Sequence, residues 1–272
     1  MLNVACIQPQ INQSRNKCYI EIEKILKTLL NKNIKCEFIC LPERWIPYDR
    51  DKESNFQKER GKDYQFIKKL AKEHNINIIS GGIWEKRSNS NKPFITSYFI
   101  NKHGEEMGRQ DKIHLYSFER TTFESSSELN IFKLKSFNFA ILICFDMAFF
   151  ETPRLASENK ANILFSPTQI RDSGLNNWDI YLKARALENR IPIVACNTFG
   201  EFTNRTFPGK SKILSFTFGH YSPSLIKMIE APYKSSGYVY DSIDIEFANK
   251  LRKQRLSEKV EKSEISVNII SI

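Results

Sequence analysis

The chain has 272 residues, of which 41% are apolar and 12% aromatic, and its 41 Lys and Arg against 31 Asp and Glu give a formal charge of +10. This composition excludes a collagen, a coiled coil and a disordered tail. No apolar stretch approaches the roughly 20 residues that span a bilayer, and the first residues show no signal-type segment. We therefore expect a soluble, cytoplasmic protein with no membrane partner.

The first half of the chain alternates strand-like and helix-like segments. Apolar residues recur at helical spacing over 22–30 and again over 62–74, where each set forms one face of an amphipathic helix. Between and after these helices, short apolar runs bounded by turn residues predict strands at 3–8, 36–41, 76–84, 96–101 and 107–114.

The second half continues the alternation without a linker. Residues 131–136 and 138–144 predict a hairpin, and helices are expected near 151–159 and at 177–190. Further strands are expected at 162–166, 191–197, 210–216 and 238–245. Since no repeat, low-complexity block or Pro/Gly/Ser-rich linker interrupts this order, we expect one α/β domain over residues 1–272.

The basic charge, the cysteines and the histidines do not point to a nucleic-acid, disulfide or metal site. The lysines are spread along the chain among glutamates, as on a solvated surface, so nucleic-acid binding is not expected. The six cysteines form no CxxC pair, and several lie inside apolar runs. The four histidines are dispersed, and no second ligand has metal spacing around His114. We expect neither a metal nor a cofactor.

Three reactive side chains stand where predicted strands end. Glu43 follows the strand at 36–41, Lys112 lies near the end of the strand opened by Met107, and Cys144 closes the run Ala-Ile-Leu-Ile. Ligand sites in α/β proteins collect at the carboxyl ends of strands, so these three could converge on one site. Cys144-Phe145-Asp146 also passes directly from a buried strand into a turn and helix, an elbow that can present a nucleophile. Taken alone, Cys144 could equally be another buried cysteine.

A family resemblance appears in the segments around these three residues. Leu-Pro-Glu at 41–43, Gly-Arg-Gln-Asp-Lys-Ile-His-Leu at 108–115 and Ile-Cys-Phe-Asp-Met-Ala at 143–148 resemble the nitrilase superfamily of carbon-nitrogen hydrolases. That family is defined by a Glu, Lys, Cys triad in this order. Further segments that resemble family signatures follow in order at 161–167, at Trp178, and at 184–190, 195–200 and 209–213.

The resemblance implies a role for each residue of the triad. Cys144 would be the nucleophile, Glu43 the general base and acid, and Lys112 the cation beside the oxyanion, aided by the backbone N–H of Phe145. A second glutamate belongs to the family pattern, and Glu119, seven residues after Lys112, is preferred over Glu124. The glycine-containing turn usual after this glutamate is replaced here by Ser-Ser-Ser-Glu at 125–128.

Other residues are candidates for contacts with the substrate or for structural roles. Tyr116, Trp45 and Thr168 are candidate substrate-binding residues, although aromatic side chains of this kind more often belong to the core. Arg185 and Glu188 are three residues apart on one helix face and are expected to form a structural pair.

The resemblance also implies a fold, an activity and an assembly. We expect a four-layer α-β-β-α sandwich that forms a homodimer or a larger homo-oligomer. The implied reaction is hydrolysis of a small non-peptide amide or N-carbamoyl compound through a cysteine thioester, releasing ammonia or an amine. Cys-Phe-Asp at 144–146 resembles the amidase and carbamoylase branches, whereas true nitrilases commonly carry Cys-Trp-Glu, so a nitrile is the less favoured substrate.

A different class of function stays open at this point. The family's turn after Ile213 is replaced, and the segment from about 217 to 236 matches no known pattern, so the C-terminal part is divergent. A catalytically silent protein of this fold that acts by binding is therefore the alternative, against which the intact Glu43, Lys112 and Cys144 argue. The sequence leaves undetermined which compound is the substrate and whether a separate synthetase partner exists.

Overall fold

Two β-sheets form the centre of the molecule in the computed structural model, which describes residues 1–32, 34–48, 53–202 and 204–270. The first sheet has eight strands in the order β16-β1-β2-β4-β6-β5-β3, with β7 paired to β6. Its strands are β1 (Leu2–Gln8), β2 (Phe38–Cys40), β3 (Gln57–Lys58), β4 (Asn77–Ile79), β5 (Ile83–Lys86), β6 (Phe94–Ile100), β7 (Glu106–Asp111) and β16 (Gly237–Ile243).

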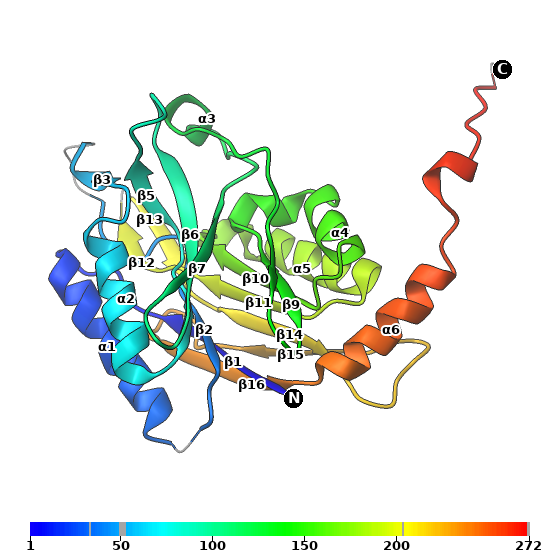
Figure 1. Cartoon of the computed structure of the whole chain (residues 1–272), viewed down its shortest axis with the longest axis horizontal. Helices are drawn as coiled ribbons and strands as arrows, with labels where there is room; N and C mark the ends of the chain where they lie inside the picture. The colour runs from blue at the N-terminus through cyan, green and yellow to red at the C-terminus, as the bar shows by residue number, and fades with distance from the viewer. Residues whose placement is uncertain (33, 49–52, 203, 271–272) are drawn as a thin grey trace.

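The second sheet has six strands in the order β15-β14-β11-β10-β9-β8, and a hairpin forms a separate two-stranded sheet (Figure 1). The six strands are β8 (Ile131–Lys133), β9 (Asn138–Ile141), β10 (Ile163–Thr168), β11 (Ile193–Asn197), β14 (Lys212–Phe216) and β15 (Ile226–Glu230). The hairpin consists of β12 (Phe199–Phe202) and β13 (Arg205–Pro208).

The two sheets pack face to face through aromatic side chains. Phe38 and Phe99 of the first sheet meet Phe139 and Phe165 of the second, with ring centroids 5.8 Å apart for Phe38–Phe165 and 5.0 Å for Phe99–Phe139. Successive residues of a strand point to opposite faces, so Ile39, next to Phe38, packs on the other side of its sheet. Each sheet therefore has a second apolar face that needs a cover.

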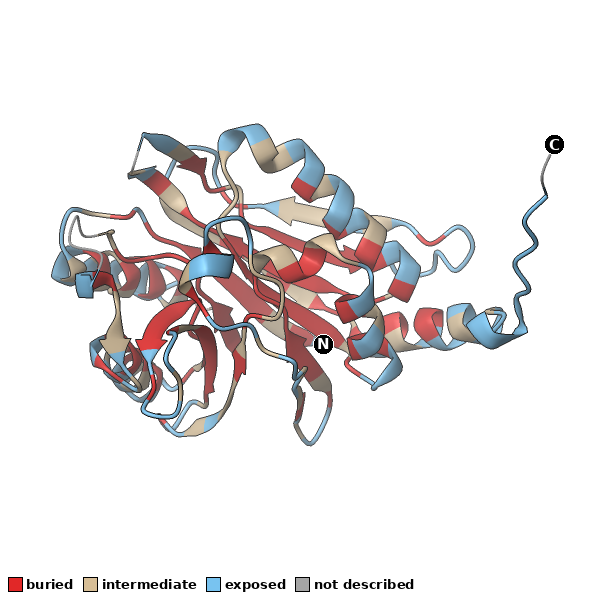
Figure 2. Ribbon diagram, turned by 90° about the horizontal axis from the view of Figure 1, so that it is seen from above, coloured by how far each residue is buried: buried red, intermediate tan, exposed pale blue. Residues whose placement is uncertain are grey.

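Helices supply that cover and complete four layers. Helices α1 (Arg15–Leu30) and α2 (Lys62–His74) pack on the first sheet through an apolar face that includes Leu26 and Ile67. Helices α4 (Glu151–Glu158), α5 (Leu175–Asn189) and α6 (Ile245–Ser257) pack on the second sheet through residues such as Leu182. Buried residues are accordingly concentrated in the strands and on the inner helix faces (Figure 2). The predicted α-β-β-α sandwich is confirmed.

The structure differs from the predicted elements mainly in the C-terminal third. The strand expected at 238–245 ends at Ile243, because Asp244 begins helix α6 by accepting a hydrogen bond from the Phe247 N–H at 2.9 Å. Residues 226–230, inside the segment that matched no pattern, form edge strand β15. Helix α6 and the β12–β13 hairpin were not predicted, and the chain beyond α6 extends away from the body (Figure 1).

The remaining helical elements are short. They are α3 (Glu119–Thr122) and the 3-10 turns η1 (Glu53–Asn55), η2 (Cys144–Ala148), η3 (Asp172–Gly174) and η4 (Lys262–Glu264). Within the described residues, no helix has the length and apolar character needed to cross a membrane.

Candidate active site

Glu43 lies just beyond the carboxyl end of β2, between the two sheets. Its backbone N–H donates to the Thr168 carbonyl at 3.1 Å, and its own carbonyl accepts from the Gly82 N–H at 3.1 Å. The backbone at Pro42 and Glu43 passes so close to residues 81 and 82 that both must be glycine. A Cβ at residue 81 would lie 2.1 Å from the Pro42 carbonyl oxygen, and a Cβ at residue 82 would lie 2.5 Å from the Glu43 carbonyl oxygen. The Glu43 side chain is 3% exposed.

Lys112 connects two glutamates at the centre of the site. Its Nζ donates to Glu43 Oε1 at 2.7 Å and to both carboxylate oxygens of Glu119, at 2.9 and 2.7 Å. Glu119 also accepts a hydrogen bond from the Tyr116 N–H at 2.7 Å. The Lys112 side chain is 1% exposed, whereas Glu124, the rival of Glu119, lies exposed on the surface. The structure therefore brings Glu119, and not Glu124, to Lys112.

Burial and charge act against each other on this cluster. Burial alone would lower the pKa of Lys112, but the carboxylates of Glu43 and Glu119 outweigh it and raise that pKa. Burial raises the pKa of Glu119, and the Lys112 ammonium opposes this rise without cancelling it. Lys112 therefore stays a fixed positive charge at neutral pH.

Cys144 follows β9 at the first residue of η2. Its φ of 48° lies in the left-handed region, a conformation that is rare for residues with a side chain and typical of a nucleophile elbow. Asp146 anchors the turn by accepting hydrogen bonds from the Ile143 N–H at 2.8 Å and the His114 N–H at 2.7 Å. On the other side of the turn, Arg185 donates to the Ala148 carbonyl at 2.9 Å. The sharp turn is therefore held from both sides.

The elbow leaves the backbone N–H of Phe145 without an acceptor inside its own turn, because the first N–H groups of a helix have no carbonyl before them. Such a group can hold an oxyanion next to the nucleophile.

Arg185 also forms an ion pair with Glu188 at 3.0 Å, which is the structural pair that the helix spacing predicts.

The thiol of Cys144 is protonated at neutral pH. Burial is the larger cause of its raised pKa and the Glu43 carboxylate the next, whereas the Lys112 ammonium and a backbone hydrogen bond involving Gln169 act in the opposite direction. A protonated thiol is a weak nucleophile, so attack by this sulfur needs a base. Among the charged groups, the Glu43 carboxylate has the strongest influence on the pKa of this thiol.

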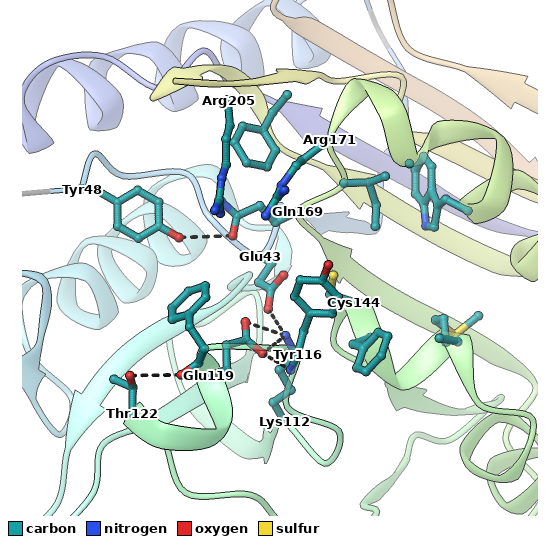
Figure 3. A pocket seen from close by; sticks show the side chains of 18 of the residues that line it. Glu43, Tyr48, Lys112, Tyr116, Glu119, Thr122, Cys144, Gln169, Arg171 and Arg205 are labelled. Atoms are coloured by element: carbon teal, nitrogen blue, oxygen red, sulfur yellow. Dashed lines mark hydrogen bonds and ion pairs between the residues drawn. The ribbon is translucent and has the colours of Figure 1, made fainter. Parts of the chain in front are cut away.

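One cavity of about 760 Å³ joins these residues (Figure 3). Cys144, Glu43, Lys112 and Glu119 lie in its wall, and so does Tyr116, whose ring packs edge-on against Phe145 with centroids 5.1 Å apart. Other parts of the wall are aromatic, from Tyr48, Phe56, Trp84, Phe118, Trp178, Tyr181, Phe202 and Phe207. The expected position of Tyr116 beside the substrate is compatible with this wall.

Trp45 and Thr168 do not line this cavity, which corrects their proposed contacts with substrate. Trp45 is fully buried on the helix side of the first sheet, where its indole N–H donates to the Ser80 carbonyl at 2.8 Å. Thr168 is also fully buried, and its hydroxyl donates to the Cys196 carbonyl at 3.0 Å. The Thr168 carbonyl instead positions Glu43, so its role is structural.

Several polar residues of the cavity were missed at the sequence level, among them Gln169, Arg171 and Arg205. Gln169 and Arg171 follow β10, so the strand-end rule applied to a third parallel strand would have found them. Arg205 opens β13, and no local pattern places that hairpin over the site. Gln169 accepts a hydrogen bond from the Tyr48 hydroxyl at 3.3 Å.

A buried arginine supports the wall formed by Tyr48 and Trp84. The Arg44 guanidinium lies 4.3 Å from the Tyr48 ring centroid and 4.2 Å from that of Trp84. It donates to the Pro47 carbonyl at 2.8 Å and to Asn55 at 3.1 Å, and its Nε and Nη1 atoms have no hydrogen-bond partner within the described chain. Among the same residues, no cluster of three or more His, Cys, Asp or Glu side chains could hold a metal.

Comparison with known proteins identifies the family. The carbon-nitrogen hydrolase family model matches residues 3–253, so the chain belongs to that family. It is 31% identical over 193 residues to a probable nitrilase of Schizosaccharomyces pombe, covering 71% of this chain and 68% of that protein. It is 30% identical over 215 residues to 2-oxoglutaramate amidase of Bacillus subtilis, covering 78% and 82%.

A solved structure shows the same fold. Nit3 of Saccharomyces cerevisiae, a member of branch 10 of the nitrilase superfamily, superposes with a TM-score of 0.83 over 97% of each chain at 20% identity. The resemblance to the nitrilase superfamily is thereby confirmed for both sequence and fold. The chain is a carbon-nitrogen hydrolase.

Proposed function

We propose that this hydrolase cleaves a small non-peptide amide through a thioester on Cys144. The observation that carries this proposal is the contact of Lys112 with both Glu43 and Glu119 in the wall of the cavity that also contains Cys144. A base, a fixed cation and a nucleophile are the groups that amide cleavage at neutral pH needs. The name of the Bacillus subtilis relative, an amidase, supports an amide as the substrate.

In the first half-reaction Glu43 takes the thiol proton while the sulfur of Cys144 attacks the carbonyl carbon. The Lys112 ammonium and the Phe145 N–H hold the resulting oxyanion, and one such donor contributes about 3 to 4 kcal/mol. When the carbon–nitrogen bond breaks, Glu43 returns its proton to the nitrogen, so ammonia or an amine leaves and the acyl group remains on sulfur.

In the second half-reaction a water molecule attacks the thioester and Glu43 takes its proton. The same two donors hold the second oxyanion until the carbon–sulfur bond breaks. Glu43 then protonates the departing thiolate, which restores the thiol and releases the carboxylic acid. Glu119, bonded to Lys112 through both oxygens, would hold the ammonium in place through both halves.

The reaction is tested by ammonia release from a panel of amides, N-carbamoyl amines and nitriles. We expect turnover of amides by the wild type and its loss in Cys144→Ala. Cys36→Ala is the matched control, since Cys36 is a half-buried cysteine outside the cavity. Turnover that survives in Cys144→Ala would refute the cysteine mechanism, and nitrile turnover without amide turnover would reassign the substrate.

We also propose that the chain assembles as a homo-oligomer. Helices α4 and α5 expose large apolar side chains, including Leu155 at 48% and Ile180 at 64%, on the side facing away from the second sheet. Exposed apolar patches of this kind are typical of protein interfaces. Light scattering that reports only a monomer at micromolar concentration would contradict the assembly.

A further inference from the structure

One backbone peptide group, the bond between Thr168 and Gln169, lies between the base and the nucleophile. Its carbonyl accepts a hydrogen bond from the Glu43 backbone N–H at 3.1 Å. The backbone of Gln169 also forms a hydrogen bond with the sulfur of Cys144, and this bond favours the thiolate. Only a donor favours the thiolate, so the group that meets the sulfur is the Gln169 N–H. The two ends of one planar amide therefore contact Glu43 and Cys144.

The register of two parallel strands explains this position. β9 and β10 pair with Ile141 beside Phe165, and Cys144 and Thr168 are each three residues further along. Neighbouring parallel strands keep their register, so the nucleophile leaves β9 next to the end of β10. Gln169 follows that end and lines the cavity together with Cys144 (Figure 3).

A buried asparagine on the next strand holds the chain on the far side of Gln169. Asn197 of β11 pairs with Thr168, is fully buried and does not line the cavity. Its side chain accepts from the Ile170 N–H at 2.7 Å, and it donates to the Ile170 carbonyl at 3.2 Å and the Gly209 carbonyl at 2.7 Å. The peptide group that follows Gln169 is thereby fixed, which restricts rotation of the Gln169 backbone.

The residue after β11 fixes the other end of the same peptide group. The Thr198 backbone N–H donates to the Thr168 carbonyl at 3.2 Å, and the Thr198 hydroxyl donates to the Arg44 carbonyl at 2.8 Å. The Thr168 carbonyl therefore accepts from two backbone donors, those of Glu43 and Thr198. The amide cannot turn its N–H away from the sulfur without breaking these bonds.

The sulfur needs a donor whenever it carries negative charge. In the proposed reaction this charge develops as Glu43 takes the thiol proton, and again when the carbon–sulfur bond breaks and leaves its electron pair on sulfur. Lys112 also favours the thiolate, but its ammonium bonds Glu43 and Glu119 and would hold the oxyanion. A second donor, held on the sulfur by the backbone, leaves Lys112 available for the oxyanion.

We propose that the Gln169 backbone N–H is a further catalytic donor, which stabilises the thiolate of Cys144, and that Asn197 is the residue that positions it. This inference rests on the proposed thioester mechanism. A hydrogen bond to a charged group changes an equilibrium by about tenfold or more. Because the donor belongs to the backbone, no side-chain pattern marks it in the sequence.

Alkylation of Cys144 by iodoacetamide tests the donor without any substrate. At a fixed pH below the midpoint the rate follows the thiolate fraction, so loss of the donor slows the reaction. Gln169→Pro removes the N–H, and the strand residue before it suits a proline. Gln169→Ala is the matched control, because it removes the side chain and keeps the N–H. We expect Cys144 to react at least about tenfold more slowly in the proline variant than in the alanine variant.

The sign of the change in Asn197→Ala separates positioning from a general loosening of the site. A variant that only released Glu43 would remove one cause of the raised pKa of Cys144, so the thiol would react faster. We expect alkylation of Cys144 to slow by about three- to tenfold, because the Gln169 N–H leaves the sulfur. Asn89→Ala makes the same change in an exposed turn outside the cavity and is expected to keep the rate.

Cys36 is an internal control for the fold. It is half-buried and lies outside the cavity, so its alkylation, measured in the same peptide digest, should not change in any of these variants. Circular dichroism shows whether each variant is folded. If the substitutions at Gln169 or Asn197 unfold the chain, amide exchange decides. The Gln169 N–H should then exchange at least about fivefold faster in Cys144→Ala than in the wild type, since it loses its acceptor.

The outcomes distinguish this inference from the reaction itself. Equal alkylation rates in the two Gln169 variants, faster alkylation in Asn197→Ala, or equal amide exchange overturns the donor. None of these results affects the cysteine mechanism, which depends on turnover and its loss in Cys144→Ala. Conversely, slower alkylation in Gln169→Pro supports the donor even if no amide is hydrolysed.

Discussion

The two ends of the cavity differ in whether their charged side chains are paired with opposite charges. At the inner end, Lys112 and two glutamates are almost fully buried and satisfy one another at 2.7 to 2.9 Å. At the outer end, Arg171 is half-buried, Arg205 is exposed, and neither has a partner in the described chain. The inner cluster is complete without a ligand, whereas the outer pair is not.

This difference assigns catalysis to the buried cluster of Glu43, Lys112 and Glu119, and selection among substrates to the two arginines. A buried ion cluster keeps its geometry because breaking it would leave an uncompensated charge, so it can hold a base and a cation in fixed positions. Unpaired arginines at a solvated mouth cost little in stability and are available to an incoming anion. Changes at the inner end should therefore affect every substrate, and changes at the outer end only charged ones.

The largest expected effect comes from removing the base. Glu43→Gln keeps the shape of the side chain but cannot take the thiol proton, so we expect kcat/KM to fall by about 10²- to 10⁴-fold for charged and neutral amides alike. Steady-state ammonia release measures this. A loss confined to carboxylate-bearing amides would mean that Glu43 acts in selection and not in chemistry.

The next largest effect is on stability. Lys112→Met leaves Glu43 and Glu119 buried side by side without their cation, which should destabilise the fold by about 3 to 5 kcal/mol. Urea unfolding measures the change, and Lys183→Met at an exposed position of α5 is the control. A loss below about 1 kcal/mol would show that the cluster is not electrostatically coupled as the geometry indicates.

A third prediction concerns the pH dependence of thiol reactivity. The pKa of Cys144 is raised by burial and by Glu43, so alkylation by iodoacetamide should be slow at neutral pH and accelerate only as pH rises through and beyond the ordinary thiol range. Glu43→Gln removes the second-largest cause of the raised pKa while the Lys112 ammonium still lowers it, so the midpoint should move to lower pH. Peptide mass spectrometry locates the adduct, and an unchanged midpoint would contradict the coupling.

The smallest effect concerns Trp45. Trp45→Phe removes the indole hydrogen bond to Ser80 and some core volume, so we expect destabilisation of about 1 to 2 kcal/mol. We expect kcat/KM to stay within about twofold, because Trp45 does not line the cavity. A large increase in KM without a loss of stability would restore Trp45 as a substrate contact.

The inner end could be predicted from the sequence, and the outer end could not. Glu43 and Cys144 each follow a parallel strand, so local patterns mark both as candidate site residues. Their strands belong to different sheets, and the ordered family motifs predicted that the two residues meet. Trp45 was misplaced because the chain turns after Glu43 and directs the indole to the helix side of the sheet. Arg205 was missed because contacts distant in sequence position its hairpin, as where the Gln10 backbone pairs with Phe199.

The central claim is a covalent bond between the substrate and the sulfur of Cys144. Rapid acid quenching of the wild type during turnover of its fastest amide, followed by peptide mass spectrometry, tests it most directly. We expect a mass increase equal to that of the acyl group on the peptide that contains Cys144, and neither adduct nor turnover in Cys144→Ala. An acyl group on a different residue, or turnover that continues in Cys144→Ala, would contradict the account.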